Sequence, residues 1–266
     1  MSILEHKKNV SSQNGEDGII EYIFKKMGLI KKGNFIEFGA WDGTHLSNAY
    51  QLFQRYSWSG IYIEMDSHKF YQLENNFKHF EDITCIKTEV GFDKHNKLDT
   101  IIDESDHKNK EFDFVSIDVD GLDFWIFQKM EKYLPKVICI EVNAGHSPNF
   151  DQLVPMGIAK HNIGQSILVI SKEAEKKGYF PLCYTGNLFL VKNEYKHLFQ
   201  EHIKSFTEIY EDFLKYLDKS NPGGVEHLYN KFVKNHQYGE YFINPELREF
   251  TKNLQQSNDT NLQETS

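Results

Sequence analysis

The chain has 266 residues, a formal net charge of −9 at pH 7 and 39% hydrophobic residues. This length fits one α/β domain with an extension, or two small domains, and it is long enough for a sizeable core. The acidic balance argues against nucleic acid as a partner, because such binding needs concentrated Lys and Arg. No apolar run approaches the roughly 18 residues of a membrane span, and the N-terminus lacks an apolar signal core, so we expect no membrane partner.

The three cysteines, Cys85, Cys139 and Cys183, are scattered and form no C-x-x-C pair. Each lies in or beside an expected strand. An odd, scattered set of this kind is typical of buried, reduced thiols. We therefore expect a cytoplasmic protein.

The first informative segment precedes an expected amphipathic helix that starts near Asp17. The apolar positions after Asp17 recur at helical spacing, and Asp17 is a plausible N-cap for that helix. An alternative is that Gln13 and Asp17 reach a ligand pocket from outside the sheet. The residues alone favour neither interpretation.

Residues 34–48 predict a buried strand, a glycine turn and the start of a helix from about Thr44 to Tyr56. Backbone N–H groups of such a turn face outward and can meet a ligand. Gly39 removes the Cβ that would block a close approach, and Gly43 permits an unusual φ. Glu37 and Asp42 add acceptors, which suit a cationic or hydroxyl-rich ligand. A plain tight turn is the alternative.

The second expected strand, residues 61–66, ends in acidic residues about twenty positions after the glycine turn. In doubly wound nucleotide-binding sheets, an acidic residue at this place accepts hydrogen bonds from both ribose hydroxyls. Glu64 is the candidate for that role, and Asp66 instead suits the N-cap of a helix over 67–79. After the third strand, residues 83–87, Glu89 and Val90 are candidates for bordering an adenine.

The fourth and fifth expected strands both end in polar side chains. Asp118 and Asp120 follow the fourth strand and share a face, whereas Asp123 suits a helix N-cap. The two neighbouring carboxylates repel unless a cation or a shared proton joins them, which indicates metal or general-base chemistry. Asp120 also suits a turn with the glycine that follows it.

The fifth strand, residues 137–143, contributes Glu141 and Asn143, and His146 follows in the next loop. Oxygen ligands such as Asp118, Glu141 and Asn143 suit Mg²⁺ or Mn²⁺. His146 is a candidate general base near neutral pH. A surface position in the loop is the alternative for His146.

The rest of the chain predicts a long loop over 149–163, a helix over 165–177 and a terminal β-hairpin. Beyond residue 192, apolar residues follow a helical period over about six turns and stop at the sequence Asn-Pro-Gly-Gly, positions 221–224. We therefore divide the chain into a domain over 1–192, a helical extension over 193–250 and a disordered tail over 251–266. The apolar stripe of the extension suits packing on its own domain, with a homodimer interface or a substrate lid as alternatives.

Five motifs in this order resemble the FkbM-type group of class I S-adenosylmethionine-dependent methyltransferases. They occupy residues 12–18, 35–43, 63–64, 116–121 and 139–143, so the likeness covers roughly residues 11–192. The resemblance implies a Rossmann-like fold with a seven-stranded, mostly parallel sheet, an antiparallel last strand and helices on both faces. Members are typically O-methyltransferases of sugars or natural products, many of them in bacterial polysaccharide pathways.

The resemblance implies S-adenosylmethionine as cofactor and a small-molecule substrate, such as a sugar or sugar nucleotide. The cofactor-binding residues that we assign on this basis are Gln13, Asp17, Glu37, Gly39, Asp42, Ser47, Asn48, Glu64, Glu89, Val90 and Asp118. Some related sugar methyltransferases hold Mg²⁺ with one aspartate after the fourth strand and two acids after the fifth. Asp118 matches the first position, and Glu141 and Asn143 stand in place of the pair.

The expected reaction is in-line transfer of the sulfonium methyl group to a substrate hydroxyl. A hydroxyl is a poor nucleophile until its proton is removed, and His146 or Asp120 is the candidate base. A metal at Asp118 that lowers the hydroxyl pKa is the alternative. Two other functions remain open: N-methylation of an amine or phosphorylated amino alcohol, and a nicotinamide-binding or other non-catalytic nucleotide-binding module.

Overall fold

A seven-stranded sheet forms the centre of the molecule in the computed structural model, which describes residues 2–234, 242 and 244–264. The strand order is β3-β2-β1-β4-β5-β7-β6. Strands β1 to β5 pair in parallel, and β7 runs antiparallel to both β5 and β6. The strand bounds are β1 Asn34–Phe38, β2 Ser59–Glu64, β3 Ile83–Lys87, β4 Phe114–Ile117, β5 Val137–Glu141, β6 Tyr179–Tyr184 and β7 Asn187–Lys192.

Helices connect the strands and then continue beyond the sheet. Those within the sheet region are η1 Ile3–His6, α1 Glu16–Lys26, α2 Tyr50–Tyr56, α3 Ser67–Phe77, α4 Leu98–Asp103, α5 Asp123–Lys129, α6 Met156–Ala159 and α7 Ile167–Lys176. Those after the last strand are η2 Asn193–His202, α8 Phe206–Ser220, α9 Gly224–Leu228, η3 Tyr229–Lys234 and α10 Pro245–Glu264. This order and the reversed β7 confirm the predicted Rossmann-like class I methyltransferase fold.

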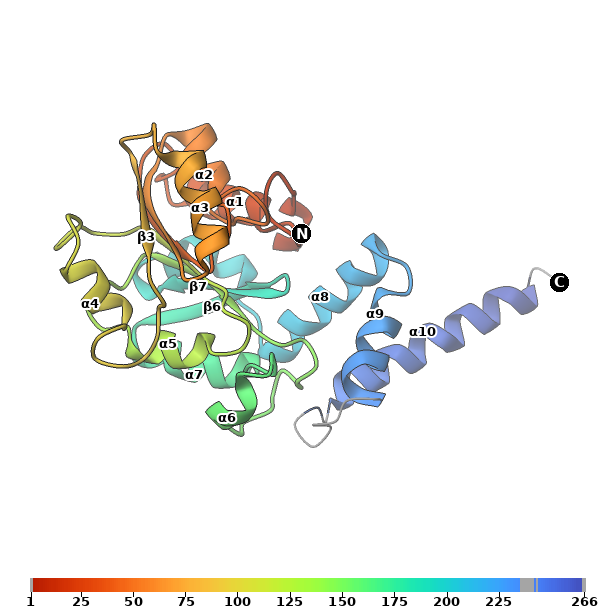
Figure 1. The fold of residues 1–266 in the computed structure, drawn as a ribbon. Coiled ribbons are helices and arrows are strands. Elements are labelled where there is room, and N and C mark those ends of the chain that lie inside the picture. Colours follow the sequence, from red (N-terminus) through yellow and green to blue (C-terminus); the bar gives the residue numbers. More distant parts are fainter. Residues whose placement is uncertain (1, 235–241, 243, 265–266) are drawn as a thin grey trace.

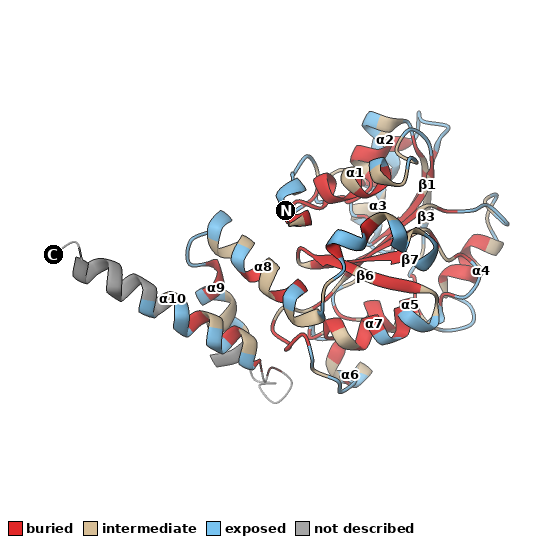
Figure 2. Cartoon of the chain, turned by 180° about the vertical axis from the view of Figure 1, so that it is seen from behind, coloured by how far each residue is buried: buried red, intermediate tan, exposed pale blue. Residues whose placement is uncertain are grey.

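The helices cover both faces of the sheet, as Figure 1 shows. Helices α1, α2 and α3 bury their apolar sides against one face, where Phe24, Leu52 and Phe77 meet Phe35 and Tyr62 of the strands. Helices α4, α5, α7 and α8 pack on the other face. The parallel strands are therefore buried on both sides, which explains their nearly continuous apolar sequences. The buried residues in Figure 2 accordingly concentrate in the sheet and in the helix sides that face it.

The strand register brings the carboxyl ends of the central strands to one level. Phe38 at the end of β1 pairs with Ile63 of β2 and with Ile117 of β4. Ile117 in turn pairs with Ile140 of β5. The residues that follow these positions (Gly39, Glu64, Asp118 and Glu141) therefore meet at one edge of the sheet. Ligands of doubly wound sheets bind at this edge.

The expected helix from Thr44 is wrong over its first residues, because α2 begins only at Tyr50. The intervening chain is a loop in which Leu46 adopts a left-handed conformation with φ of 58°. Asp42 accepts hydrogen bonds from the backbone N–H groups of Thr44 and His45, at 2.8 and 2.7 Å. The β1–α2 connection is therefore longer than predicted, and it supplies more residues to the site.

The helical segment after β7 is broken rather than continuous, since η2 ends at His202 and α8 starts at Phe206. Ser205 caps α8 and forms a reciprocal capping box with Glu208. The apolar stripe of α8 is buried in the core on its own domain, through residues such as Phe213 and Leu214. The helix ends at Ser220, as the Asn-Pro-Gly-Gly signal predicted.

The tail that we expected to be disordered from residue 251 is helical as far as Glu264. Thr251 is buried and donates a hydrogen bond to the carbonyl oxygen of Leu247, and Leu254 packs against the core. The polar composition of this segment predicted disorder, but Leu247, Phe250 and Leu254 give the start of α10 apolar contacts with the core.

The three cysteines are free, and two of them, Cys139 and Cys183, are buried. Burial raises the pKa of both thiols, which keeps them protonated and unreactive. Among the described residues, no helix combines the length and apolar character needed to cross a membrane.

Candidate active site

Two cavities open at the carboxyl edge of the sheet. The first, which we call the turn cavity, has a volume of about 680 Å³ and is lined by the connections that follow β1, β2, β3 and β4. The second, the outer cavity, has a volume of about 890 Å³ and lies between residues 7–15, the end of β5, the β6–β7 turn and the helices after β7. Three residues line both cavities: Gln13, Asp118 and Glu141.

Gly39 lets the β1 turn pass close to β4. It has φ of 73°, a region that favours glycine. A Cβ at this position would stand 2.1 Å from the carbonyl oxygen of Asp118, far inside van der Waals contact. Only glycine therefore fits here, and its lack of a side chain lets the turn lie against the end of β4.

Glu37 organises the far wall of the turn cavity. Its carboxylate accepts hydrogen bonds from the Ser47 hydroxyl and from the backbone N–H of Asn48, the latter at 2.7 Å. Burial raises the pKa of Glu37 to about 7, against the lowering effect of these donors. The Asn48 side chain donates to the Ser116 hydroxyl on β4 at 3.0 Å. Glu37, Ser47 and Asn48 all line the turn cavity.

Glu64 occupies the end of β2, where the sequence places a ribose-binding carboxylate. One oxygen accepts the N–H of Trp41 at 2.9 Å, and the other accepts the N–H of Asp66 at 2.8 Å. Each carboxylate oxygen keeps a further lone pair for a ligand hydroxyl. Glu89 and Val90 lie on the same cavity wall after β3. Asp66 caps α3 through the N–H groups of His68 and Lys69, each at 2.9 Å, as expected.

Two predicted cofactor-binding residues lie away from the turn cavity. Asp17 is buried, and one of its oxygens accepts the backbone N–H groups of Val10, Ser11 and Ser12, each at 2.8 Å. It therefore holds the N-terminal loop instead of a ligand, and Gly15 rather than Asp17 occupies the N-cap of α1. The carboxylate of Asp42 likewise accepts hydrogen bonds within the turn after Gly39, and Asp42 does not line the cavity. The predicted ligand contacts of Asp17 and Asp42 are corrected accordingly.

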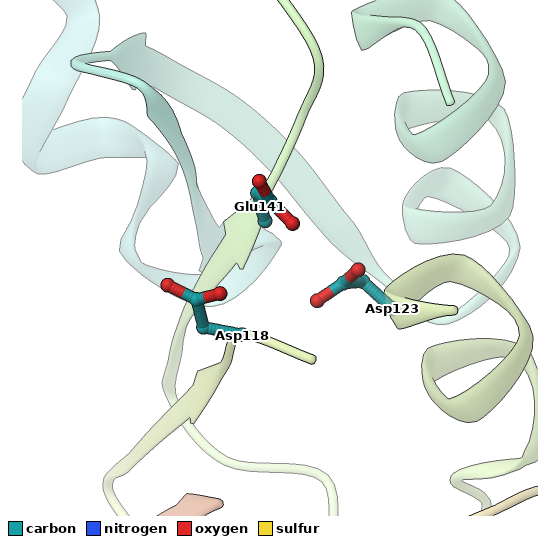
Figure 3. A group of neighbouring side chains, drawn as sticks. All are labelled: Asp118, Asp123 and Glu141. Carbon is teal, nitrogen blue, oxygen red and sulfur yellow. The ribbon is translucent and has the colours of Figure 1, made fainter. Parts of the chain in front are cut away.

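A group of three carboxylates stands at the junction of the two cavities (Figure 3): Asp118, Asp123 and Glu141 each offer one oxygen within 4.8 Å of the others. Asp118 faces the cavities and keeps solvent access, whereas Asp123 is buried and accepts the N–H groups of Val119 and Gly121, both at 2.9 Å. Asp123 is the residue that the sequence interpretation missed, since it reads as an ordinary helix-start residue. The one feature of the sequence that could have pointed to Asp123 is its position close after Asp118.

The pKa of all three carboxyl groups is raised, chiefly because the surrounding protein displaces part of their water, although Asp118 keeps access to solvent through the cavities. Mutual repulsion adds to the effect at Asp118 and Glu141. The pKa of Asp118 rises to about 8 and that of Glu141 to about 9. That of Asp123 rises to about 6, because its backbone donors partly offset burial. Such groups bind a proton or a cation near neutral pH, and their oxygen donors fit a hard divalent ion such as Mg²⁺ or Mn²⁺.

The two other predicted members of this site have different positions. Asn143 lines the outer cavity, but its side-chain oxygen accepts the N–H of Gly145 at 2.9 Å and its amide nitrogen donates to the carbonyl oxygen of Asn162 at 3.1 Å. Asp123 therefore replaces Asn143 in the carboxylate group. Asp120 lines the turn cavity, with a left-handed φ of 56° that fits the predicted turn.

His146 is wrong as a general base. It is 2% exposed, stacks on Phe150 with ring centroids 5.4 Å apart, and lines neither cavity. Its Nε2 lies 2.9 Å from the carbonyl oxygen of Ile163, so this nitrogen carries a proton and donates it. The sequence signal failed because a histidine just after a strand end has the same pattern whether it faces the site or the core.

No protein-family model matches the chain, so the FkbM-type resemblance stays a prediction. No curated protein matches it either. A solved S-adenosylmethionine-dependent methyltransferase from Aquifex aeolicus is similar with 11% identity and a TM-score of 0.38, over 64% of this chain and 86% of that chain. YjhP from E. coli is similar with 11% identity and a TM-score of 0.41, over 89% and 90%. The [4+2]-cyclase SpnF is similar with 9% identity and a TM-score of 0.43, over 89% and 82%. No conclusion about activity follows from likenesses at this level.

Proposed function

We propose that this protein is an S-adenosylmethionine-dependent methyltransferase that methylates a hydroxyl of a sugar or sugar nucleotide in polysaccharide or natural-product biosynthesis. One observation carries the proposal: two adjacent cavities meet at Gln13, Asp118 and Glu141. A group-transfer enzyme needs such an arrangement, because donor and acceptor must approach each other in line. The free thiols of the chain are consistent with a cytoplasmic location.

The turn cavity suits the cofactor. Glu64 offers lone pairs to the ribose hydroxyls, and Val90 and Glu89 offer a border for the adenine. The turn at Gly39 leaves space for the amino-acid end, and Gln13 lies where it would close the cavity. The sulfonium group supplies the reactive methyl, so the protein has only to align, exclude water and accept a proton.

Asp118 and Glu141 are the candidate bases for the acceptor hydroxyl, in place of His146. Both line the two cavities at their junction, and a carboxylate with a pKa of about 8 or 9 is a better proton acceptor than an ordinary one. Asp123 keeps its neighbours in place and contributes negative charge. This charge also favours a cationic sulfonium nearby.

A divalent cation fits the carboxylate group, which consists of oxygen donors that repel one another without one. Asp118, Asp123 and Glu141 would hold it, and when bound it would lower the pKa of an acceptor hydroxyl. Proton removal by the chain's own carboxylates does not depend on this ion. The two possibilities differ in their response to chelators.

Calorimetric titration with S-adenosylhomocysteine tests the proposal, with NAD as the control and with Mg²⁺ or EDTA in parallel. Micromolar binding of S-adenosylhomocysteine alone is expected. Binding of NAD instead would support a nicotinamide-binding module, and binding of neither would refute the enzyme assignment. Incubation with S-adenosylmethionine and a panel of sugar nucleotides, followed by mass spectrometry, then identifies the acceptor.

N-methylation of an amine or a phosphorylated amino alcohol is the second candidate. The three carboxylates at the cavity junction favour it, because an acidic junction attracts an ammonium group and an amine needs less help from a base. Product analysis by NMR separates the two, since an O-methyl and an N-methyl group have different carbon shifts.

A further inference from the structure

Three lysines line the outer cavity, together with the carboxylates Asp118 and Glu141. The lysines are Lys7, Lys8 and Lys231, whereas the chain as a whole has a net charge of −9. None of these three lysines forms an ion pair within 4 Å among the residues that the structure describes. Two of them come from the N-terminal loop, and Lys231 comes from the last helices.

Lys7 is the most constrained of the three. Its side chain is half-buried. The aliphatic stem packs against Gly15 so closely that a Cβ on this glycine would stand 2.7 Å from the Cβ of Lys7. Its ammonium group lies 4.2 Å from the centre of the Tyr216 ring. Burial lowers the pKa of Lys7, and the nearby charge of Glu16 opposes that effect. The free energy gained on binding a ligand anion is largest for a cation that is held in place without an ion pair.

The carboxylate of Glu16 does not neutralise these lysines directly. It accepts hydrogen bonds from the Thr185 hydroxyl at 2.8 Å and from the backbone N–H of Asn14 at 2.6 Å. Glu16 is fully buried below the β6–β7 turn. Lys7 therefore keeps its ammonium group available to a ligand, whereas the charge of Lys231 also acts on Glu141 of the same cavity, where it opposes the rise in the pKa of that carboxyl group.

We infer that the acceptor carries a phosphate or diphosphate group, which Lys7, Lys8 and Lys231 bind in the outer cavity. Three ammonium groups around one cavity favour a ligand with more than one negative charge, and lysine is a common point-charge partner of phosphate. The volume of about 890 Å³ accommodates a sugar with such a group attached. This inference rests on the proposed function, in which the outer cavity holds the acceptor.

A competing explanation is that these lysines bind the carboxylate of the cofactor. Their position argues against it, because all three line the outer cavity and none lines the turn cavity. Lys69 is the lysine on the turn cavity wall, where it lies 4.3 Å from the centre of the Trp41 ring. The two explanations predict different effects on cofactor affinity.

The test is calorimetric titration of the protein, with and without saturating S-adenosylhomocysteine, using glucose, glucose 1-phosphate, UDP-glucose and pyrophosphate as probes. The variants are Lys7→Gln and Lys231→Gln, with Lys176→Gln as a matched control on the exposed face of α7. Lys231 is exposed, so its variant tests the inference even if Lys7→Gln fails to fold. Glucose 1-phosphate and UDP-glucose distinguish a phosphate monoester from a diphosphate.

We expect at least one phosphate-bearing probe to bind ten times more tightly than glucose. Lys7→Gln and Lys231→Gln should each weaken that binding about tenfold, with the control and the affinity for S-adenosylhomocysteine within twofold of the parent. Equal binding of glucose and the phosphate probes would overturn the inference, as would a tenfold loss of S-adenosylhomocysteine affinity in either variant. If no phosphate probe binds while S-adenosylhomocysteine does, the inference fails and the proposed function stands. Because the probes are also titrated without S-adenosylhomocysteine, failure of that ligand to bind refutes only the proposed function.

Discussion

Gly39 and Asp118 touch through their backbones: a Cβ on Gly39 would stand 2.1 Å from the Asp118 carbonyl oxygen. The contact joins the glycine turn after β1 to the strand end that supplies the carboxylate at the cavity junction. Any residue larger than glycine must push these two segments apart. The position of Asp118 relative to the turn cavity therefore depends on Gly39.

Gly39→Ala should destabilise the protein by at least about 2 kcal/mol, since the left-handed φ alone costs an L-residue about 1–2 kcal/mol and the backbone clash adds to it. The melting temperature should fall by about 4 °C or more. Gly157→Ala is the matched control, because nothing lies within 4 Å of its Cβ and its φ is not positive. That control should stay within about 1 kcal/mol of the parent. Equal melting temperatures for the two variants would contradict the conclusion that only glycine fits at position 39.

Glu64→Gln should weaken binding of S-adenosylhomocysteine about tenfold to a hundredfold, because a hydrogen bond to a charged group contributes about 1.5–3 kcal/mol. Asp42→Ala is the contrasting variant. Asp42 supports only its own turn, so its loss should lower stability by about 1 kcal/mol and leave the affinity within threefold. Calorimetry and thermal melting separate the two effects. A larger affinity loss in Asp42→Ala than in Glu64→Gln would reverse the assignment made here.

Asp118→Asn should lower turnover at least about a hundredfold while the affinity for S-adenosylhomocysteine changes little, because loss of a general base typically costs 10²–10⁴ in rate. The parent's rate should rise with pH up to about 8, where the Asp118 carboxyl group loses its proton. His146→Asn is the comparison. It removes a buried, stacked ring, so it should lower the melting temperature and leave the shape of the pH profile unchanged. Methyl transfer to an identified acceptor, followed across pH 5–9, checks both expectations.

Glu141→Gln should melt at a higher temperature than the parent at pH 9 in EDTA, and at the same temperature near pH 4. The folded-state pKa of Glu141 is about 9, well above the unfolded value of about 4.3. The parent therefore loses stability as the pH rises through this window, because the buried carboxyl group must ionise, whereas the amide has no such cost.

Addition of Mg²⁺ or Mn²⁺ tests the carboxylate group by the same measurement. The ions should raise the melting temperature of the parent at pH 8–9, because binding to the folded state stabilises it by mass action. Glu141→Gln and Asp123→Asn should show little response. If millimolar Mg²⁺ and Mn²⁺ leave the melting temperature of the parent unchanged, the group does not bind these ions and its carboxyl groups share protons instead.

Much of the fold follows from local patterns in the chain. Short apolar runs, each ended by glycine or an acidic residue and separated by helical periods, specify the order of strands and helices, and the terminal hairpin specifies the reversed strand. The positions of Gly39, Glu64 and Asp118 at the carboxyl edge could be predicted, because each stands at or directly after a strand end that the sequence marks. Parallel strands in register then bring such positions together without further information.

The sheet, its carboxyl edge and the residues near that edge thus follow from patterns along the chain. Which of the polar side chains near that edge face a cavity depends on how the whole fold packs. In the folded protein His146 packs in the core, and Asp17 and Asp42 accept hydrogen bonds from their own loops. Asp123 joins the carboxylate group. The fold also brings Lys7 and Lys231 to one cavity from opposite ends of the chain. The physical reason is that local patterns record periodicity and turn chemistry, whereas the direction of a loop side chain depends on packing between segments that are distant in sequence.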